Sequence, residues 1–597
     1  MPLLLTLVFV LSGAAGLIYE SIWSRYLGLF VGHSAYAQVI VLVIFLGGMS
    51  AGAALIGRRS SRIRDPLLWY AVIEVLVGMA GIAFHDVFGA VSAFAYARLF
   101  PALAGGVLLT VVKWSLAAAL ILPQSVLLGA TFPLMTAGFL RRTTSDGVAD
   151  SGRVLGLLYF ANSIGAAAGV LVAGFYLLGA YGLPGTLLTA AFLNVICGGT
   201  VYAIVRLQRE AEAPLVGEPL PPPPPPIDAP VMPALPTLRR LLLGVALGTA
   251  LASFVYEIVW IRMLALVLGS ATHAFELMLS AFILGLALGA WWIRARADTL
   301  RDPIRTLGVI QWLMGAAAVA TLGFYLSTFD WTAYLLSALQ KTDEGYRIFN
   351  LSRYAICLIV MLPATFCAGM TLPLITRLLI GAGAGERAIG QVYSVNTLGS
   401  IVGAALASLV LLPLLGFKTL LLIGGGIDMA LGVLLLWWAG RTNAETARFA
   451  AMSAAGAFGI LITTAIGARI DPGITTAGVF RYGSVPKAGE REIAFYADGR
   501  TSTVSVRRAD VGNGPGAEYS LATNGKPDAS LSPVWFRPPA PFEKRKRVDG
   551  DESTQILLPL ITLAHAPFAK EGAVIGQGSG MSSHFLLGSS TLERLTT

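Results

Sequence analysis

Charged residues are scarce in this sequence. Asp, Glu, Lys and Arg make up 13% of its 597 residues, whereas hydrophobic residues make up 56%, and the mean hydropathy is +0.73. A soluble globular protein carries about a quarter charged residues. The shortage therefore excludes an ordinary soluble protein and predicts a polytopic membrane protein that contacts a lipid bilayer.

Cysteine is also rare, and a basic leader is absent. The three cysteines, Cys197, Cys357 and Cys367, all lie in apolar runs, so they predict small buried side chains rather than a disulfide framework. No metal site is predicted. The chain is apolar from Pro2 without a basic segment or cleavage site, so we interpret its start as a membrane span and not as a signal peptide. The net charge of +9 does not predict nucleic-acid binding, because most Lys and Arg lie in short loops between apolar runs.

A short stretch that occurs twice organises the rest of the chain. YESIWSRYLGLFVG runs from Tyr19 to Gly32, and YEIVWIRMLALVLG runs from Tyr256 to Gly269. Tyr, Glu, Trp, Arg and the closing Gly recur in register, and LPQSVLLGATFPL likewise returns as LPATFCAGMTLPL. Such duplication predicts two copies of one membrane unit.

Apolar runs of about 20 residues are long enough to cross a bilayer. In the first half they cover residues 3–22, 36–56, 67–84, 107–136, 154–178 and 186–205, and in the second half residues 241–261, 273–293, 304–325, 354–379, 389–412 and 419–438. A further run covers residues 449–466. Each half has an even number of spans, so the two copies have the same orientation and form a parallel repeat.

Three segments qualify this arrangement. The fourth run contains Pro123 and Pro133 and is either one kinked helix or two spans. Residues 86–106 are aromatic and only moderately apolar, which predicts an interfacial helix. Residues 210–236 include six consecutive prolines, 221–226, and predict an extended linker. Arginines that flank the even-numbered loops and this linker predict a cytoplasmic N-terminus.

The composition changes after residue 470 to that of a soluble domain. Turns at Asp498-Gly499 and Asn524-Gly525, each between alternating runs, predict β-hairpins. Residues 551–565 predict a helix, and residues 573–575 predict a short buried strand that enters the glycine loop GQGSG. A glycine trio alone fits either an ordinary tight turn or a ligand pocket at a helix N-terminus.

These observations predict an all-α polytopic membrane bundle of two parallel six-helix repeats plus an extra span, followed by the start of an α/β domain. The predicted divisions are residues 1–209 (first repeat), 210–236 (linker), 237–440 (second repeat), 441–470 (extra span) and 471–597 (soluble domain).

Ionisable groups in the duplicated stretches are the leading polar candidates. Glu20 with Arg25, and Glu257 with Arg262, are five residues apart, which is not a helical pair spacing, so each is expected to find a partner on another helix. Charged groups inside membranes usually face a partner or a water-filled cavity. The alternative is a structural cap or interfacial snorkelling at the ends of the spans.

Other polar residues lie within the runs. Glu74, whose counterpart in the second half is Gln311, lies well inside a span and is the candidate for proton or cation coupling; Asp428 and Glu276 are further single candidates. Lys113 and Arg353 correspond across the repeat and fit interfacial snorkelling.

Two asparagines also correspond across the repeat. Asn162 and Asn396 fit ligand binding or interhelical hydrogen bonding equally.

The segment from Gly478 onward resembles the polyamine synthase (spermidine synthase) family, in the pieces ADGRTSTVSV, TNGKPDAS, AHAP and AVIGQGSG. In that family a β-hairpin subdomain precedes a Rossmann-like, methyltransferase-type domain. The membrane part, with its repeated Tyr-Glu-x-x-Trp-x-Arg and LP…G-x-T…P motifs, resembles that of bacterial fused proteins, which join a major-facilitator-like region to a spermidine-synthase-like domain. The resemblance implies a multi-pass protein of the bacterial inner (plasma) membrane.

The resemblance also implies residue roles. The family's glycine loop cradles decarboxylated S-adenosylmethionine and maps to Gly576, Gly578 and Gly580, with Ser579 where the family has an Asp. His565 and Gln555 map near the substrate pocket. The family's ribose-binding acid and catalytic Asp lie further along its chain than these residues extend, so we expect an incomplete domain that does not transfer an aminopropyl group by itself.

Two functions follow, and a third is open. The first is polyamine-related group transfer, in which an amine attacks the carbon beside a sulfonium while a carboxylate takes the proton, coupled to a membrane part that binds or moves an amine. The second is a transporter of a polyamine or another small cation with a soluble appendage that performs no chemistry. A purely structural membrane anchor is the third.

Overall fold

The computed structural model describes residues 2–31, 34–59, 62–103, 106–143, 150–211, 236–270, 272–441, 443–510, 517–532, 535 and 552–597. The six-proline run lies outside these residues. The chain forms two compact units. Unit 1 comprises Met1–Ile261, Ala271–Gly323 and Asn350–Ala468, and unit 2 comprises Arg262–Ser270, Phe324–Phe349 and Arg469–Thr597.

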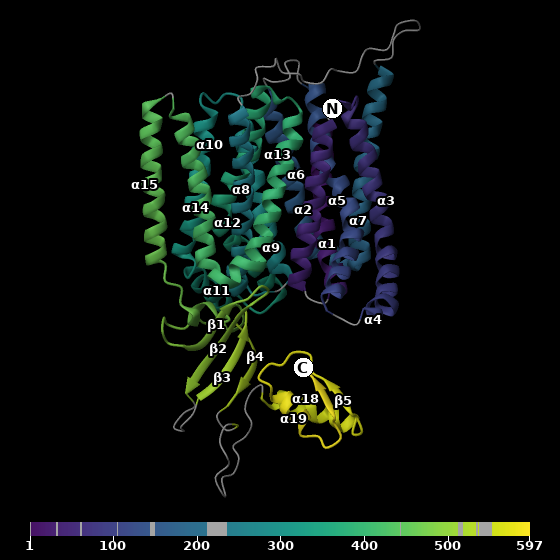
Figure 1. The fold of residues 1–597 in the computed structure, drawn as a ribbon, viewed down its shortest axis with the longest axis vertical. Coiled ribbons are helices and arrows are strands. Elements are labelled where there is room, and N and C mark those ends of the chain that lie inside the picture. Colours follow the sequence, from purple (N-terminus) through teal and green to yellow (C-terminus); the bar gives the residue numbers. More distant parts are fainter. Residues whose placement is uncertain are drawn as a thin grey trace. The chain divides into compact units, whose positions relative to one another are not determined.

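Unit 1 is a bundle of long helices (Figure 1). In its first half the helices are α1 (Pro2–Val31), α2 (Ser34–Arg59), α3 (Pro66–Phe94), α4 (Phe100–Ala102), α5 (Val107–Thr143), α6 (Ser151–Val172) and α7 (Leu178–Ala211), with π-helical turns η2 (Ala95–Leu99) and η3 (Ala173–Leu177). In its second half they are α8 (Pro236–Leu268), α9 (Thr272–Arg294), α10 (Pro303–Phe324), α12 (Asp343–Leu379), α13 (Arg387–Leu406), α14 (Leu412–Ala439) and α15 (Ala444–Gly467), with π-helical turns η4 (Ile380–Ala384) and η5 (Ala407–Leu411). The last residues of α8 and the first of α12 belong to unit 2.

The described helices account for every predicted membrane span. Eleven helical stretches are long and apolar enough to cross a membrane, and two of them have 60 and 53 residues. At 1.5 Å per residue, each of these two is far too long for a single crossing of a hydrocarbon core of about 30 Å. Each contains a non-helical glycine, Gly182 (φ 65°) or Gly416 (φ 70°), and so holds two of the predicted spans.

Several predicted helix ends are wrong. The first span was expected to end near residue 22, but α1 continues to Val31, because apolar residues resume after Arg25. For the fourth run, by contrast, the alternative of a single helix is confirmed, because α5 continues through Pro123 and Pro133. Residues 86–94 continue α3 instead of starting a separate interfacial helix, because no proline interrupts them.

The two halves repeat the same close helix contacts. A Cβ atom at Gly52 would lie 2.0 Å from the Val126 carbonyl oxygen, and one at Gly289 would lie 2.0 Å from that of Phe366. These glycines therefore let α2 approach α5, and α9 approach α12, backbone to backbone. The same correspondence joins Gly48–Ser125 to Gly285–Thr365, and Gly165–Val10 to Gly399–Leu247.

The two halves meet through two helix pairs. Helix α2 packs against α13, and α6 packs against α9. In the first pair, the Ser50 hydroxyl donates to the Ser394 carbonyl oxygen at 3.0 Å. In the second, the Ser280 hydroxyl donates to the Ala167 carbonyl oxygen at 3.0 Å.

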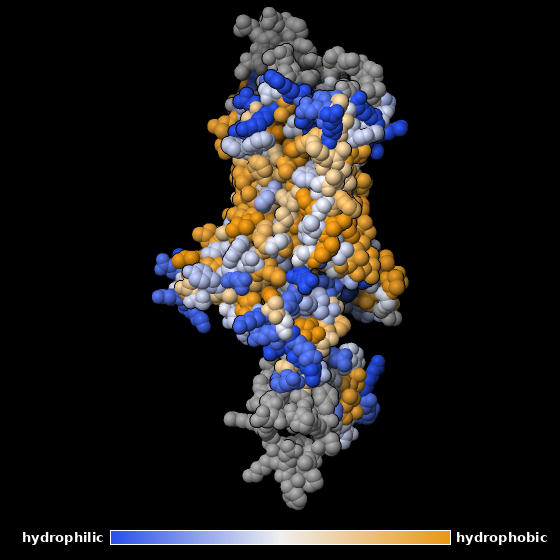
Figure 2. Space-filling model, turned by 90° about the vertical axis from the view of Figure 1, so that its left-hand side faces the viewer, coloured by the Kyte–Doolittle hydropathy of each residue, from blue (hydrophilic) through white to orange (hydrophobic). Residues whose placement is uncertain are grey.

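Large apolar side chains cover the outside of the bundle. Trp69, Met79, Phe192 and Phe458 are each more than half exposed. Figure 2 shows hydrophobic residues gathered in a band on the helices, with hydrophilic residues at the helix ends. Exposed apolar side chains on this scale are unusual for a soluble monomer and are expected where lipid is the solvent.

Unit 2 contains a four-stranded antiparallel sheet. Strands β1 (Glu492–Asp498), β2 (Thr503–Asp510), β3 (Ala517–Thr523) and β4 (Lys526–Leu531) pair in chain order. Both predicted hairpins are present, and Asn524 (φ 49°) with Gly525 (φ 76°) forms the β3–β4 turn, as a two-residue turn of this kind requires. The short helices α11 (Ser327–Ala338), α16 (Pro472–Thr475) and α17 (Val479–Tyr482) also belong to this unit.

The remaining part of unit 2 is smaller than a Rossmann-like domain. Helix α18 (Glu552–His565) matches the predicted helix, and α19 (Met581–Leu587) connects β5 (Glu571–Ala573) to β6 (Arg594–Thr596) in parallel. The predicted buried strand at residues 573–575 is wrong, because the strand ends at Ala573 and Ile575 is fully exposed. Only two strands form this sheet in the described residues, so its faces are not both covered.

The close glycine contacts make a direct test possible. Gly52→Ala should destabilise the bundle by about 1–3 kcal/mol, because the added methyl group collides with backbone and not with a movable side chain. Thermal unfolding of purified protein in detergent measures this. Gly47→Ala, on the same helix with open space around the position, is the control, and equal melting temperatures for the two variants would contradict the packing.

Candidate functional site

The two duplicated glutamates lie within electrostatic reach of each other in unit 1. Glu20 on α1 is half-buried and Glu257 on α8 is 6% exposed, and the two carboxyl groups are close enough to interact electrostatically. No described residue donates a hydrogen bond to either carboxyl group. Unit 1 thus holds an acidic pair, one group from each half, without an ion-paired partner in the part of the chain that the structure describes.

Aromatic pairs fix the rotation of the two helices that carry these glutamates. Trp23 stacks on Tyr19 at 5.2 Å between ring centroids, and Trp260 packs on Tyr256 at 5.4 Å. All four side chains are almost fully buried. Trp23 also contacts Phe45 and Phe84 of the first half, and Trp260 donates to the Thr321 hydroxyl of the second half.

An ion pair joins the halves near the start of α9. The Arg25 Nη2 atom lies 2.5 Å from the Glu276 Oε1 atom, and the Glu276 side chain is 1% exposed. His273 contacts the other oxygen of Glu276 at 3.2 Å and stacks on Phe175 at 4.6 Å. The Glu276 carboxyl group lies where a Cβ atom of Gly174 would be, so only glycine leaves room for it.

A second ion pair joins the halves near the opposite helix ends. Arg141, near the end of α5, donates Nε to Glu386 Oε1 at 2.7 Å and Nη2 to Glu386 Oε2 at 2.5 Å. The two side chains are 2% and 4% exposed. Arg141 also donates to the Ile63 carbonyl oxygen at 2.8 Å. A buried bidentate pair of this kind is strong and directional.

Asp298 adds a further link between the halves at the same end. It accepts from Arg377 Nε at 2.7 Å and from the backbone N–H groups of Gly152 and Arg153 at 3.0 Å and 2.8 Å. Its carboxylate therefore sits at the N-terminus of α6, where an anion is favoured.

Aromatic side chains also join the two halves. Phe132 of the first half stacks on Tyr393 of the second at 5.1 Å between centroids and contacts Tyr159 edge-on at 6.1 Å. Ion pairs and an aromatic stack thus join the two halves at several points.

A separate polar cluster lies inside the first half. Glu74 is fully buried and accepts from the Ser12 hydroxyl at 2.6 Å and from Asn194 Nδ2 at 2.5 Å. These residues come from α3, α1 and α7. The sequence singled out Glu74, but the structure places it within one half and not at the interface.

The second half contains the same cluster with acid and amide exchanged. Gln311 Nε2 donates to Asp428 Oδ1 at 3.2 Å, the Tyr256 hydroxyl donates to Asp428 Oδ2 at 2.6 Å, and the Thr249 hydroxyl donates to Gln311 Oε1 at 3.1 Å. The sequence analysis recognised that Glu74 and Gln311 occupy equivalent positions of the repeat. It missed that Asn194 and Asp428 are also equivalent. The offset of 234 residues that relates Tyr159 to Tyr393 also relates these two and would have revealed it.

The structure separates several residues that the sequence grouped together. Arg262 Nη2 donates to the Gly499 carbonyl oxygen at 3.1 Å within unit 2, so it does not repeat the ion pair of Arg25. Lys113 lies 5.1 Å from the Phe100 ring centroid. Arg353 is only 4% exposed and donates to Asn350 at 3.0 Å, so the predicted snorkelling is wrong for it.

The two candidate asparagines do not link helices. Asn162 and Asn396 are half-buried, and no described residue hydrogen-bonds to either side-chain amide.

The glycine loop of unit 2 has the backbone that its sequence predicts. Gly576, Gly578 and Gly580 have φ of 89°, 55° and 80°, values that other residues rarely adopt. Ser579 donates to Gln555, which itself donates to the Ser530 carbonyl oxygen at 3.2 Å.

His565, by contrast, is exposed and contacts the Ile561 carbonyl oxygen of its own helix. Within the described part of the chain, no three His, Cys, Asp or Glu side chains gather as a metal site, and the three cysteines are free and buried.

Comparison with known proteins gives similarities to solved membrane transporters. No family model and no curated protein matches the chain. A bacterial homologue of the iron transporter ferroportin, in an outward-facing state with soaked iron, is similar with a TM-score of 0.49 and 13% identity over 74% of this chain and 100% of that chain. The human organic anion transporter and the nucleoside transporter NupG each give a TM-score of 0.43 and 14% identity over 73% of this chain and 98% of theirs.

The exchanged clusters make a sharp prediction about stability. Asn194→Asp alone should destabilise the protein by a few kcal/mol, because it sets a second buried carboxyl group against Glu74. Glu74→Gln combined with Asn194→Asp should recover stability, because it recreates the pairing of Gln311 with Asp428. Tyr19 corresponds to Tyr256, and its hydroxyl has no described partner, so it can serve the new carboxyl group.

Thermal unfolding followed by tryptophan fluorescence measures the effect. The reciprocal exchange, Gln311→Glu with Asp428→Asn, is the matched control in the second half. A double variant no more stable than Asn194→Asp alone would show that the two clusters are not equivalent.

Proposed function

We propose that this chain is a membrane transporter for a small organic cation of the polyamine type, and that its extramembrane part is an appendage without chemistry of its own. The proposal rests on one observation: Glu20 of the first half and Glu257 of the second are close enough to interact electrostatically, and neither has a cationic partner among the described residues.

The chemistry of the acidic pair favours a cation. Two carboxyl groups close together in a low-dielectric interior are unfavourable when both are ionised, unless a positive charge neutralises them. A substrate with ammonium groups supplies that charge and hydrogen-bond donors together. One carboxyl group comes from each half, so a bound cation is held by both halves.

The contacts at both ends of the interface support transport rather than static binding. Arg25–Glu276 closes one end and Arg141–Glu386 closes the other, and each ion pair joins one half to the other. Breaking one pair while keeping the other would open the acidic pair to one side at a time. Rocking of two like repeats around a central site is how such alternation works.

The proposal also includes which side of the membrane each end of the chain occupies. Arginine-rich loops support a cytoplasmic N-terminus in a bacterial inner membrane. An odd number of crossings through α15 then puts residues after Gly467 outside the cytoplasm, where an adenosyl donor is scarce. This supports the appendage over aminopropyl transfer.

Binding of decarboxylated S-adenosylmethionine by the glycine loop stays a prediction. The positive φ angles of Gly576, Gly578 and Gly580 favour it. Against it, Ser579 and Gln555, two of the side chains that would line such a pocket, are hydrogen-bonded to each other.

Uptake into proteoliposomes tests the transporter proposal. The purified chain should take up radiolabelled spermidine, and Glu257→Gln or Glu20→Gln should lower the uptake about 10-fold or more, because each removes one charge-assisted contact to the cation.

Glu445→Gln changes an exposed glutamate in the first turn of α15 and should leave uptake unchanged. Melting temperatures verify that all variants are folded. The proposal fails if the unmodified chain takes up no spermidine, or if both interface variants transport as well as the control.

A further inference from the structure

A polar cavity lies on one face of the four-stranded sheet in unit 2. Its volume is about 450 Å³, within the range of about 300–1,000 Å³ that small-molecule sites occupy. Arg491, the residue before β1, lines it together with Ser505 and Arg507 of β2 and Ser520 of β3, and Thr476 and Tyr482 from the preceding segment complete the wall. Among the described residues that line it, none is acidic.

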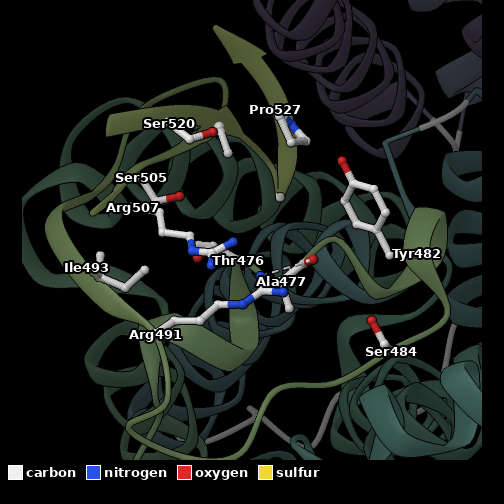
Figure 3. A pocket seen from close by; sticks show the side chains of 12 residues that line it. Thr476, Ala477, Tyr482, Ser484, Arg491, Ile493, Ser505, Arg507, Ser520 and Pro527 are labelled. Carbon is white, nitrogen blue, oxygen red and sulfur yellow. Dashed lines mark hydrogen bonds between the residues drawn. The ribbon is translucent and has the colours of Figure 1, made fainter. Parts of the chain in front are cut away.

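Strand register explains why two arginines share this cavity. Arg507 on β2 lies opposite Ile493 on β1 and Ser520 on β3, so these side chains project from the same face of the sheet. In Figure 3 the guanidinium groups of Arg491 and Arg507 point into the same space in front of Thr476.

Neither of these arginines forms an ion pair with an acidic side chain in the part of the chain that the structure describes. Arg491 donates to the Ala477 carbonyl oxygen at 3.4 Å, and no described residue forms an ion pair with Arg507. Burial, and then the positive charge of Arg507, lower the pKa of the Arg491 guanidinium, while the charge of Glu490 acts in the opposite direction. Two like charges that repel each other in a cavity favour an anion between them.

Hydroxyl groups complete the lining. Ser505 is 2% exposed, and no described residue hydrogen-bonds to its hydroxyl. Ser520, Thr476 and Tyr482 bring further hydroxyls around the same space. A mixture of guanidinium and hydroxyl donors without carboxylates is the donor set that phosphate oxygens require.

Arg508, the next residue on β2, shows the contrast. Its side chain lies on the other face of the sheet, where it forms ion pairs with Glu492 at 2.6 Å and Asp510 at 3.3 Å. These carboxylates raise the pKa of the Arg508 guanidinium. One face of the sheet thus neutralises its arginine within the protein, and the cavity face does not.

We propose that this cavity binds a small molecule through a phosphate group, with Arg491 and Arg507 as a two-pronged clamp and Ser505 as an added donor. The site is independent of the acidic pair in unit 1, and its ligand has the opposite charge to the proposed transport substrate.

Calorimetric titration of the purified full chain in detergent with inorganic phosphate and with pyrophosphate tests the site. Saturable binding is expected, and Arg507→Gln should weaken it about 10-fold, the loss of one charge-assisted contact. Arg507→Lys should retain more affinity than Arg507→Gln, because lysine keeps the positive charge although it cannot donate two parallel hydrogen bonds as a guanidinium group does.

Arg508→Gln is the matched control, one residue away on the same strand, and should bind as the unmodified chain does. Melting temperatures verify that the sheet is folded in each variant. Absence of saturable binding of both anions, or equal losses in Arg507→Gln and Arg508→Gln, overturns the proposal.

Discussion

Unit 1 places two carboxyl groups, one from each half, within electrostatic reach of each other in a low-dielectric interior. Glu20 and Glu257 occupy matching positions of a duplicated stretch, and their meeting requires that both halves fold alike and present the same helix face. Glycine contacts, aromatic pairs and the buried polar cluster of each half establish those faces. The ion pairs at the two ends then hold one half against the other without neutralising the acidic pair itself.

The sequence alone predicted the features that depend on local residue patterns or on the internal repeat. The membrane spans, the hairpin turns and the pairing of Glu74 with Gln311 all follow from local patterns or from a fixed offset. Contacts between non-equivalent residues could not be predicted this way. Arg25 and Arg262 are identical in the repeat, yet one pairs with Glu276 and the other with the Gly499 carbonyl oxygen, because their surroundings come from distant segments that are not duplicated.

Helix ends and the extent of the soluble domain were harder to predict for a different reason. Hydropathy falls at Glu20 and Arg25, which indicates the end of a span, but a helix in a bundle can hold polar groups on the side that faces another helix. Likewise, an apolar triplet before a glycine loop indicates a buried strand, yet Ile575 is exposed, because burial depends on neighbouring strands and not on the triplet itself.

Distances between spin labels on the two halves test the account most directly. Labels at Tyr181 and Leu414 mark one end of α7 and α14, and labels at Leu207 and Trp437 mark the other end; all four side chains are more than half exposed. If the halves rock around the acidic pair, adding spermidine should lengthen one of these distances while the other shortens, and Glu20→Gln with Glu257→Gln should abolish the response. Distances at both ends that do not change with spermidine would contradict the account.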